Sequence, residues 1–474
     1  MKIFHISSEM APIVKIGGMA DMIYGLVKAS LSQSHQISVI LPMYNLISSH
    51  PIKKELSLYK EFFLPSFPQI EKILVWKTNF EGAVLYFIDI PGFFPVVYGG
   101  EETLRFLLFS CAVAEFLIQF SLQVDIIHLH DWPTAFVASM LKIFYKSNLR
   151  IIFTLHNMQH QGLCNPQDFV HLGIDNNFFL PFVILQDASH PELFNLLQGG
   201  IIYADLLTTV SPTYAKEIQC NQGFGLASLI HAKQNKLYGI LNGIDYEFWN
   251  PSKDPFLAKN YSPLSLQQVL KGKSSNRLHL SKKLQLTQKN APLFTAITRL
   301  VYQKGPDLLL HAITYVKQKG GQFVLLGSSP ESPYESSFIA LQKQLQDDPN
   351  IHFCLSLDEP LSHLLYAAAD FIVIPSLFEP CGLTQMIALH FGCIPIVRKT
   401  GGLGDTIKEE ENGIVFSEFT LSSLENAIDK AFLLYNKKDS LHKIMKNGLR
   451  QDFSWKSSAL AYQQLYENID KISL

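Results

Sequence analysis

The chain is 474 residues long, and at ~150 residues per domain this length is enough for two or three domains. Hydrophobic residues make up 47% and charged residues 17%, which excludes a disordered chain and allows large buried cores. The formal net charge is only −2, whereas nucleic acids and anionic membranes bind basic surfaces. We therefore expect neither nucleic acid nor a membrane among the partners.

The cysteines and the first residues predict the cellular compartment. The six cysteines form no Cys-x-x-Cys pair and no His-interleaved zinc spacing, as expected for reduced thiols. Ser7, Ser8 and Glu9 stand where a signal peptide would need an apolar stretch. The uncharged run 380–397 contains two prolines, two glycines and a histidine, so it predicts a buried helix and strand rather than a membrane span. We expect a cytoplasmic protein.

Short apolar runs alternate with helical patterns along the first half of the chain. Continuous apolar strands of this kind are typical of parallel sheets that are covered on both faces. The runs predict strands at residues 2–6, 37–41, 84–88, 125–129, 150–155 and 206–210. Apolar residues at helical spacing predict helices from residue 19, over 104–120 and over 134–145.

A second series of the same kind follows Gly239. It predicts strands at residues 293–297, 323–326, 351–354, 371–374 and 394–397, with helices between them and a last helix over 455–472. The segment 250–288 is polar, with little apolar periodicity until its end, and we place a hinge near 240–250. This order predicts two Rossmann-like domains. Because parallel sheets bind ligands at the carboxyl ends of their strands, two facing sheets would form a site in the cleft between them.

Two glycine pairs precede predicted helices, in the sequences KIGGMAD at 15–21 and KTGGLGD at 399–405. Such a pair either lets backbone N–H groups approach an anion at a helix start, or makes a tight turn with positive φ. Neither pair has the spacing of a dinucleotide-binding fold or of a P-loop. A nucleotide-dependent oxidoreductase should show the first of these spacings, so the sequence disfavours that class.

Charged and polar residues follow four of the predicted strands. Arg299 and Lys304 share one strand-to-helix turn, where two cations either bind a single polyanion or form a solvated helix start. Glu379 follows the strand at 371–374 between apolar neighbours, where a carboxylate is either paired or functional. Asp131 and His156 follow the strands at 125–129 and 150–155. A lone histidine is often a hydrogen-bonded core residue, but its place at the carboxyl end of a strand favours function.

These motifs, taken in order, resemble those of the bacterial glycogen synthases and plant starch synthases over nearly the whole chain. The motifs are KIGGMAD at 15–21, HDW at 130–132, HN at 156–157, TVSPTYAKEI at 209–218, GILNGID at 239–245, RLVYQKG at 299–305, EPCGLTQ at 379–385 and TGGLGDT at 400–406. The resemblance implies the GT-B glycosyltransferase architecture, an α/β fold with two Rossmann-like domains facing across a cleft. It implies an acceptor-side domain at 1–240, a donor-side domain at 241–455 and a closing helix at 456–474 that crosses back to the first domain.

The resemblance also implies the reaction. A member of this family transfers glucose from ADP-glucose to the nonreducing 4-OH of an α-1,4-glucan, with retention of the anomeric configuration. Two inversions would need a nucleophilic carboxylate beneath the anomeric carbon, and the sequence identifies none. We therefore favour a front-face route, in which the departing phosphate oxygen deprotonates the acceptor. No metal or cofactor is implied, and no Asp-x-Asp dyad occurs in the sequence.

The site residues are carried over by the same resemblance. Arg299 and Lys304 would bind the diphosphate. Glu379 would hold the glucosyl hydroxyls, and His156 would contact the sugar near its reacting centre, with Asp131 completing the catalytic set. The other substrate-binding residues are Lys15, Gly17, Gly18, Asp21, Tyr98, Trp132, Asn157, Asn242, Cys381, Gly382, Leu383, Thr384 and Leu357. Among these, Lys15 and the backbone of the glycine pair at 17–18 would complete the diphosphate cradle.

The chain departs from the family pattern at several positions. They are Pro133, Gln198, Leu377, Gly327-Ser328-Ser329 and Ser356-Leu357. The family has a tyrosine at the position of Leu357, whose ring would stack on adenine, and leucine offers no such flat face. We therefore expect UDP-glucose to be used to a measurable degree beside ADP-glucose, unless Phe353 or Tyr334 takes over the stacking.

Two alternatives share much of this pattern. One is a related retaining transferase with a small acceptor, of the sucrose- or trehalose-forming type. The other is a catalytically silent glucan-binding subunit, which should have lost Arg299, Lys304 or Glu379, whereas all three are present. The sequence makes no prediction of the oligomeric state.

Overall fold

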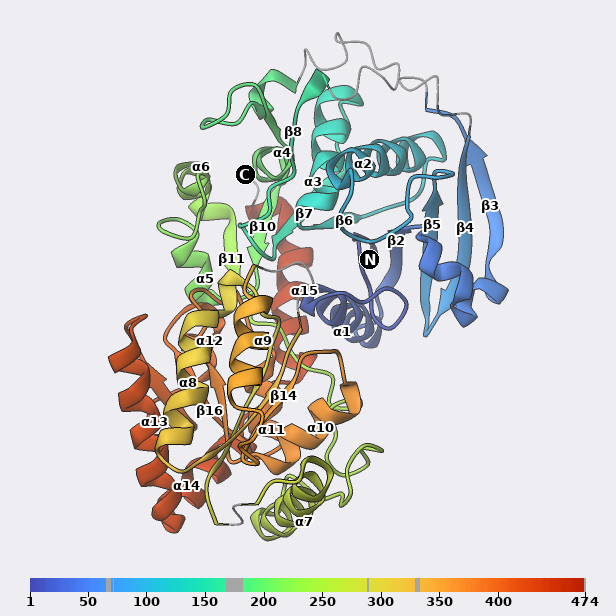
Figure 1. Cartoon of the computed structure of the whole chain (residues 1–474). Coiled ribbons are helices and arrows are strands. Elements are labelled where there is room, and N and C mark those ends of the chain that lie inside the picture. Colours follow the sequence, from blue (N-terminus) through green and yellow to red (C-terminus); the bar gives the residue numbers. More distant parts are fainter. Residues whose placement is uncertain (65–69, 71, 168–181, 288–289, 329–332, 473–474) are drawn as a thin grey trace. The chain divides into compact units, whose positions relative to one another are not determined.

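The computed structural model describes residues 1–64, 70, 72–167, 182–287, 290–328 and 333–472. The chain divides into two compact units, which Figure 1 colours by residue number. The first consists of Met1–Gly243 and Trp455–Leu474, and the second of Ile244–Ser454. The boundaries predicted in the sequence analysis lie after residues 240 and 455.

The first unit is built on a nine-stranded sheet in the order β11-β10-β7-β6-β1-β2-β5-β4-β3. From β11 to β5 every neighbouring pair is parallel, because helices connect the strands. These strands are β1 (Lys2–Ile6), β2 (Gln36–Pro42), β5 (Ala83–Asp89), β6 (Ile126–His130), β7 (Arg150–Leu155), β10 (Leu206–Thr209) and β11 (Leu237–Gly239). All six strands predicted in this half are present, within one residue at each end.

An antiparallel edge extends this sheet. The strands β3 (Ser57–Phe62) and β4 (Ile73–Phe80) continue from β5 and were not predicted from the sequence. Most side chains of β3 are exposed or half-buried, so this strand lacks the continuous apolar run by which the others were found. A separate two-stranded antiparallel sheet is formed by β8 (Leu163–Cys164) and β9 (Phe194–Asn195).

The helices of the first unit include the C-terminal one. They are α1 (Gly18–Ser32), α2 (Glu102–Gln119), α3 (Trp132–Ser139), α4 (Leu196–Tyr203), α5 (Pro212–Glu217), α6 (Ala227–Ala232) and α15 (Trp455–Ile472), with short turns at η1 (Asn45–Ser49), η2 (Pro51–Glu55), η3 (Met140–Phe144) and η6 (Gln234–Lys236). The predicted helix 134–145 is α3 followed by the π-turn η3. Trp455 packs so closely on α1 that a Cβ at Gly25 would lie 1.9 Å from its indole nitrogen.

The second unit holds a six-stranded, all-parallel sheet in the order β14-β13-β12-β15-β16-β17. Its strands are β12 (Leu293–Ile297), β13 (Gln322–Leu326), β14 (Ile351–Cys354), β15 (Phe371–Ile374), β16 (Ile394–Arg398) and β17 (Ile414–Phe416). The five predicted strands are all present, and only β17 was not predicted. The helices are α7 (Leu266–Leu284), α8 (Pro306–Gln318), α9 (Glu335–Gln344), α10 (Glu359–Ala368), α11 (Thr384–His390), α12 (Gly401–Thr406), α13 (Leu421–Asn436) and α14 (Lys438–Leu449), with the turn η7 (Tyr302–Lys304).

Helix α7 was not predicted, because its sequence has little apolar periodicity. It lies within the polar segment 250–288 and buries few apolar side chains. Its Lys273 is buried, and Nζ donates to the carbonyl of Ala369 at 2.7 Å, just past the end of α10. A lysine at a helix C-terminus satisfies carbonyls that the helix leaves unpaired. Polar anchoring therefore holds this helix where an apolar stripe would normally do so.

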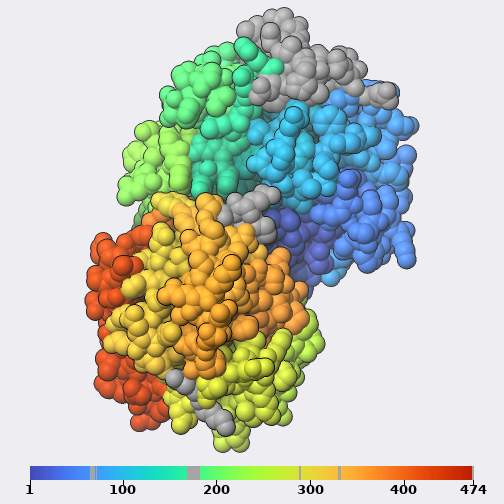
Figure 2. All heavy atoms as spheres, viewed as in Figure 1, coloured from blue at the N-terminus to red at the C-terminus, as the bar shows by residue number. Residues whose placement is uncertain are grey.

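The uncharged run 380–397 forms α11 and β16, as predicted. Among the helices that the structure describes, none is both long and apolar enough to cross a membrane. The space-filling view in Figure 2 shows the second unit with yellow, orange and red segments at its surface.

Candidate functional site

Glu379 and Lys304 form an ion pair at the carboxyl ends of the neighbouring strands β12 and β15. Lys304 Nζ lies 2.8 Å from Oε1 and 2.6 Å from Oε2 of Glu379. Ser376 Oγ donates to Oε2 at 2.9 Å, and the glutamate is only 6% exposed. A buried carboxylate needs such partners, because its charge has left water. The sequence left open whether Glu379 is paired or functional, and the structure shows that it is paired.

Arg299 lies two residues beyond β12 and is exposed. Its side chain forms no hydrogen bond or ion pair with any residue that the structure describes. A guanidinium carries five N–H donors and stays charged at any relevant pH. Arg299 is therefore a cation with its donors available, on the same strand-to-helix connection as Lys304.

The second glycine pair serves close packing around Glu379. Gly401 has a φ of +43°, and a Cβ there would lie 1.9 Å from the carbonyl oxygen of Glu379. Gly402 donates its N–H to that same carbonyl at 3.0 Å, and a Cβ on it would lie 2.0 Å from the carbonyl of Cys381. Only glycine lets α12 approach the loop so closely. The pair at 401–402 thus fixes the backbone that carries the glutamate.

The predicted residues that follow Glu379 lie on a short turn into α11. Cys381 is buried, Gly382 has a φ of +75°, and Leu383 is the N-cap of the helix that Thr384 begins. Gln385 Nε2 donates to the carbonyls of Cys381 and Gly382, at 3.2 and 2.7 Å. The turn is therefore held rigidly from within its own unit.

Asp131 follows β6 in a strained backbone conformation. Its φ of 60° and ψ of 178° are values that essentially only glycine adopts without cost. Burial raises the pKa of its carboxyl group to about 7, although backbone N–H groups of Asn157, His156 and Trp132 partly offset this. Strain and a perturbed carboxyl group together are typical of a functional residue.

His156 follows the adjacent strand β7 and is 9% exposed. Its Nε2 lies 3.3 Å from Nδ1 of His130, and its backbone N–H points to Asp131. Burial lowers the pKa of His156 to about 3, so the ring is neutral at pH 7. The two predicted residues Asp131 and His156 are thus brought together in the first unit.

The KIGG segment is held by Glu9, which the sequence analysis did not assign to the site. The Glu9 carboxylate accepts the N–H groups of Ile16 and Gly17, at 2.7 and 2.9 Å, and the hydroxyl of Tyr98 at 2.7 Å. The N–H of Gly17, which we expected to face the diphosphate, therefore has a protein partner in this structure. Gly18 is the first residue of α1. The burial of Glu9, at 3% exposed, is the feature that no sequence pattern signalled.

The remaining predicted residues of the first unit differ in what they can offer a ligand. Lys15 and Asp21 form a partly exposed salt bridge of 2.8 Å. Trp132 is only 5% exposed and packs edge-on against Phe106, so little of its ring is accessible. Asn242 is buried, and its Oδ1 has no partner among the described residues. Asn157 Oδ1 accepts the N–H of Gln159 at 3.0 Å.

Comparison with known proteins gives the family. A family model described as the starch synthase catalytic domain matches residues 2–232, and one described as glycosyl transferases group 1 matches residues 280–450. The chain is 42% identical to a glycogen synthase of Protochlamydia amoebophila, over 99% of each chain. The chain belongs to the glycogen and starch synthase family.

Solved structures agree with this assignment. The catalytic domain of starch synthase IV from Arabidopsis thaliana, bound to ADP and acarbose, matches with a TM-score of 0.88 at 38% identity, over 100% of this chain and 99% of that chain. Sucrose-phosphate synthase from Thermosynechococcus elongatus matches with a TM-score of 0.64 at 17% identity, over 99% of each chain, which shows the fold alone. The predicted GT-B fold, glycosyltransferase class and glycogen synthase function are confirmed. An oxidoreductase is excluded.

The departures from the family pattern lie at different depths. Leu357 is 94% exposed in the turn before α10, whereas Phe353 is 7% exposed within β14 and offers almost no ring face. Tyr334 is half-buried just before α9, so it is the better of the two replacements considered for base stacking. Ser329 lies outside the described residues.

Three other departures differ in their local hydrogen bonding. Gln198, where the family has lysine, donates through Nε2 to the carbonyls of Ile184 and Gln186, at 2.8 and 3.3 Å. Pro133 lies in the first turn of α3, where a missing N–H costs nothing. Leu377, where the family has arginine, donates its N–H to the carbonyl of Gln303 at 2.8 Å. None of these changes alters Arg299, Lys304 or Glu379.

Proposed function

We propose that the chain transfers glucose from ADP-glucose, and to a lesser degree UDP-glucose, to the nonreducing 4-OH of an α-1,4-glucan with retention. The ion pair of Lys304 with the buried Glu379, beside the unpaired Arg299, is the observation that carries this proposal. The 38% identical starch synthase IV, whose structure holds ADP and acarbose, supports a nucleotide donor and a glucan acceptor. We further propose that the reaction takes place in the cytoplasm.

The two cations act on the leaving group. Cleavage of the bond between the anomeric carbon and the phosphate oxygen leaves negative charge on the diphosphate. Arg299 and Lys304 are fixed donors that stabilise this charge as it grows, without the reorganisation that water would need. They take the role that a divalent metal has in other transferases, so we expect full activity in the presence of a chelator.

Glu379 holds the glucosyl hydroxyls rather than attacking the sugar. Both of its oxygens already accept hydrogen bonds, from Lys304 and Ser376. Hydrogen bonds and an ion pair lower the nucleophilicity of a carboxylate, which argues against a covalent intermediate on this residue. We therefore propose the front-face route. The bond from the anomeric carbon to the phosphate oxygen breaks, the bond to the acceptor oxygen forms, and the hydroxyl proton moves to the phosphate oxygen.

Product sizing tests the proposed function. The purified chain is incubated with ADP-glucose labelled in the glucose and with a maltooligosaccharide, and the products are separated by size. We expect label in a ladder of longer chains, which an exo-acting α-1,4-glucosidase releases again as glucose. Label confined to a disaccharide-sized product would favour the small-acceptor alternative. No label in any saccharide, with a folded protein, would contradict transfer from this donor.

A further inference from the structure

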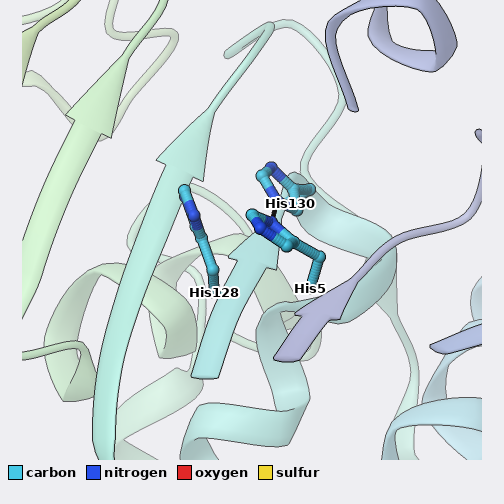
Figure 3. A group of neighbouring side chains, drawn as sticks. All are labelled: His5, His128 and His130. Atoms are coloured by element: carbon cyan, nitrogen blue, oxygen red, sulfur yellow. Dashed lines mark hydrogen bonds between the residues drawn. The ribbon is translucent and has the colours of Figure 1, made fainter. Parts of the chain in front are cut away.

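A row of buried histidines leads from the core of the first unit to His156. His5 on β1 and His128 and His130 on β6 are all 0% exposed, and Figure 3 shows these three side chains close to one another on the neighbouring strands. His5 Nδ1 lies 3.0 Å from Nε2 of His130, and His130 Nδ1 lies 3.3 Å from Nε2 of His156. Three rings, His5, His130 and His156, are therefore linked in one hydrogen-bonded row.

His128 lies beside this row but is not part of it. Its ring centroid is 4.2 Å from that of His130. Its Nδ1 is bonded to the hydroxyl of Tyr466 at 2.9 Å and its Nε2 to that of Thr154 at 2.7 Å. Both nitrogens of His130 are also engaged, so a metal ion at His5, His128 and His130 would have to displace existing hydrogen bonds. The arrangement favours a hydrogen-bonded row over a metal site.

The row has a direction because each ring is neutral. Burial lowers the pKa of His5 and of His156 to about 3, and that of His130 well below its usual value. A neutral imidazole has one N–H donor and one acceptor nitrogen. The row can therefore run in two ways only, with every ring donating toward His156 or every ring donating toward His5.

The end at His5 decides between these two directions. Nε2 of His5 is buried and has no partner among the described residues. If the rings donate toward His5, this nitrogen carries an N–H with no acceptor, and buried orphaned N–H groups are rarer than buried acceptors that lack a donor. If the rings donate toward His156, the same nitrogen is only an unused acceptor. Donation toward His156 is therefore favoured, and it makes Nε2 of His156 an acceptor and puts its proton on Nδ1.

We propose that His5 and His130 are positioning residues that hold His156 as the Nδ1–H tautomer, so that its ring donates a hydrogen bond to a hydroxyl oxygen of the donor glucose. Nδ1 of His156 has no hydrogen-bond partner in the part of the chain that the structure describes, and the residue keeps 9% of its surface exposed. The inference rests on the proposed place of His156 beside the sugar. It makes this histidine a fixed neutral donor rather than a base.

Nitrogen-15 NMR of the full-length, histidine-labelled protein tests the tautomer without any assay of activity. The signals of His156 are assigned by their loss in His156→Gln. We expect His156 to carry its proton on Nδ1 in the wild type. A proton on Nε2 in the wild type would overturn the proposal, whether or not the protein transfers glucose.

Two substitutions at His130 then test the contribution to catalysis. In His130→Asn the side-chain amide can place an N–H where Nδ1 stood, so we expect kcat within about threefold of wild type. In His130→Gln the amide lies where Nε2 stood and the donation to His156 is lost, so kcat should fall about 10- to 100-fold with little change in KM for the glucan. Equal kcat values for the two variants would overturn the positioning role.

His128→Gln is the matched control, because His128 is equally buried and hydrogen-bonded but lies outside the row. It should lower the melting temperature while leaving kcat within about threefold of wild type. A loss of kcat as large as that of His130→Gln would show a merely structural effect and overturn the proposal. If the wild type transfers no glucose at all, the proposed function fails, while the NMR result still decides the tautomer.

Discussion

The two units present opposite kinds of chemistry at the ends of their strands. In the second unit the candidate groups are charged, with Arg299 exposed and Lys304 paired to Glu379. At the ends of β6 and β7 in the first unit they are mostly neutral, since His156 lies at the end of a row of uncharged imidazoles and Asp131 has a carboxyl pKa raised to about 7. Similar parallel sheets thus carry very different electrostatics.

This difference follows what each half of the reaction needs. A diphosphate leaving group gains negative charge, and permanent cations stabilise it best. A glucosyl group bears only hydroxyls, which neutral donors and acceptors can orient at a lower cost of desolvation. We therefore propose that the cations of the second unit stabilise the leaving group, and that the neutral His156 of the first unit helps Glu379 to orient the sugar.

The largest expected effect comes from removing the cations. Arg299→Ala or Lys304→Ala should lower kcat by ~10²–10³ or more, because each removes a donor aimed at growing charge. Glucan affinity should barely change. Lys304→Ala should also destabilise the fold by about 2 kcal/mol or more, since it leaves Glu379 buried without its counterion, whereas Arg299→Ala should not. Steady-state kinetics and thermal unfolding measure both effects.

Lys317→Ala is the matched control for these variants, because Lys317 forms a salt bridge with Asp348 in the same unit, away from the ends of β12 and β15. It should retain full activity. If Arg299→Ala or Lys304→Ala keeps more than half of the wild-type kcat, the assignment of the diphosphate site is wrong.

The backbone around Glu379 should be nearly as sensitive. Gly401→Ala places a Cβ against the Glu379 carbonyl at a positive φ, so it should destabilise the second unit by about 2–3 kcal/mol and lower kcat by displacing the glutamate. Gly404→Ala in the same helix α12 is the control, since its Cβ would meet only Lys399 at an ordinary 3.6 Å. Thermal unfolding and kcat are measured for both, and similar results for the two would refute this packing account.

An intermediate effect is expected from the ionisation of Asp131. Its pKa of about 7 means that the carboxylate, the form that the surrounding backbone N–H groups favour, is lost below neutral pH. We expect kcat/KM to fall about tenfold per pH unit below pH 7, and the Asp131→Asn variant to lack this dependence. Persistence of the acid limb in that variant would assign it to another group.

The same pKa shift has a stability consequence of opposite sign. Between about pH 4 and pH 7 the folded state keeps a proton on Asp131 that the unfolded chain has released, so stability falls as the pH rises through this window. The melting temperature of wild type should therefore fall from pH 4 to pH 8 by more than that of Asp131→Asn. The opposite trend would show that this carboxyl group is not raised.

The smallest expected effect concerns the choice of donor. Leu357 is 94% exposed, so a tyrosine there would stack on a base with one face still in water, at the low end of the usual ~1–3 kcal/mol. Leu357→Tyr should raise the preference for ADP-glucose over UDP-glucose about fivefold in kcat/KM. If wild type already prefers ADP-glucose by more than ~10³ and tyrosine changes nothing, Leu357 does not determine the donor.

The regular core of both sheets was predictable because buried parallel strands are continuous apolar runs. The half-exposed strand β3 and the polar helix α7 do not follow that pattern, and Lys273 holds α7 by contacts with residues 93 to 96 positions away. Periodicity within a segment contains no information on such partners.

In the candidate site, too, the sequence did not reveal contacts between residues far apart in the chain. The residues Arg299, Lys304, Glu379, Asp131 and His156 were predicted as site residues from their places at strand ends and from family motifs. The partners of these residues were not: the pairing of Lys304 with Glu379 spans 75 positions, and the contact of His5 with His130 spans 125. Glu9 looked like an ordinary loop residue, because only the folded chain brings its carboxylate to the N–H groups of Ile16 and Gly17.

Calorimetric titration with ADP tests the division of labour between the units most directly. ADP carries the charge that the leaving group acquires but no glucose. We predict that Arg299→Ala and Lys304→Ala bind ADP at least tenfold more weakly than wild type, with a reduced dependence on salt, and that His156→Gln binds it as wild type does. Equal weakening by His156→Gln, or unchanged ADP affinity in both cation variants, would contradict the assignment of the diphosphate to Arg299 and Lys304 and of the sugar to His156.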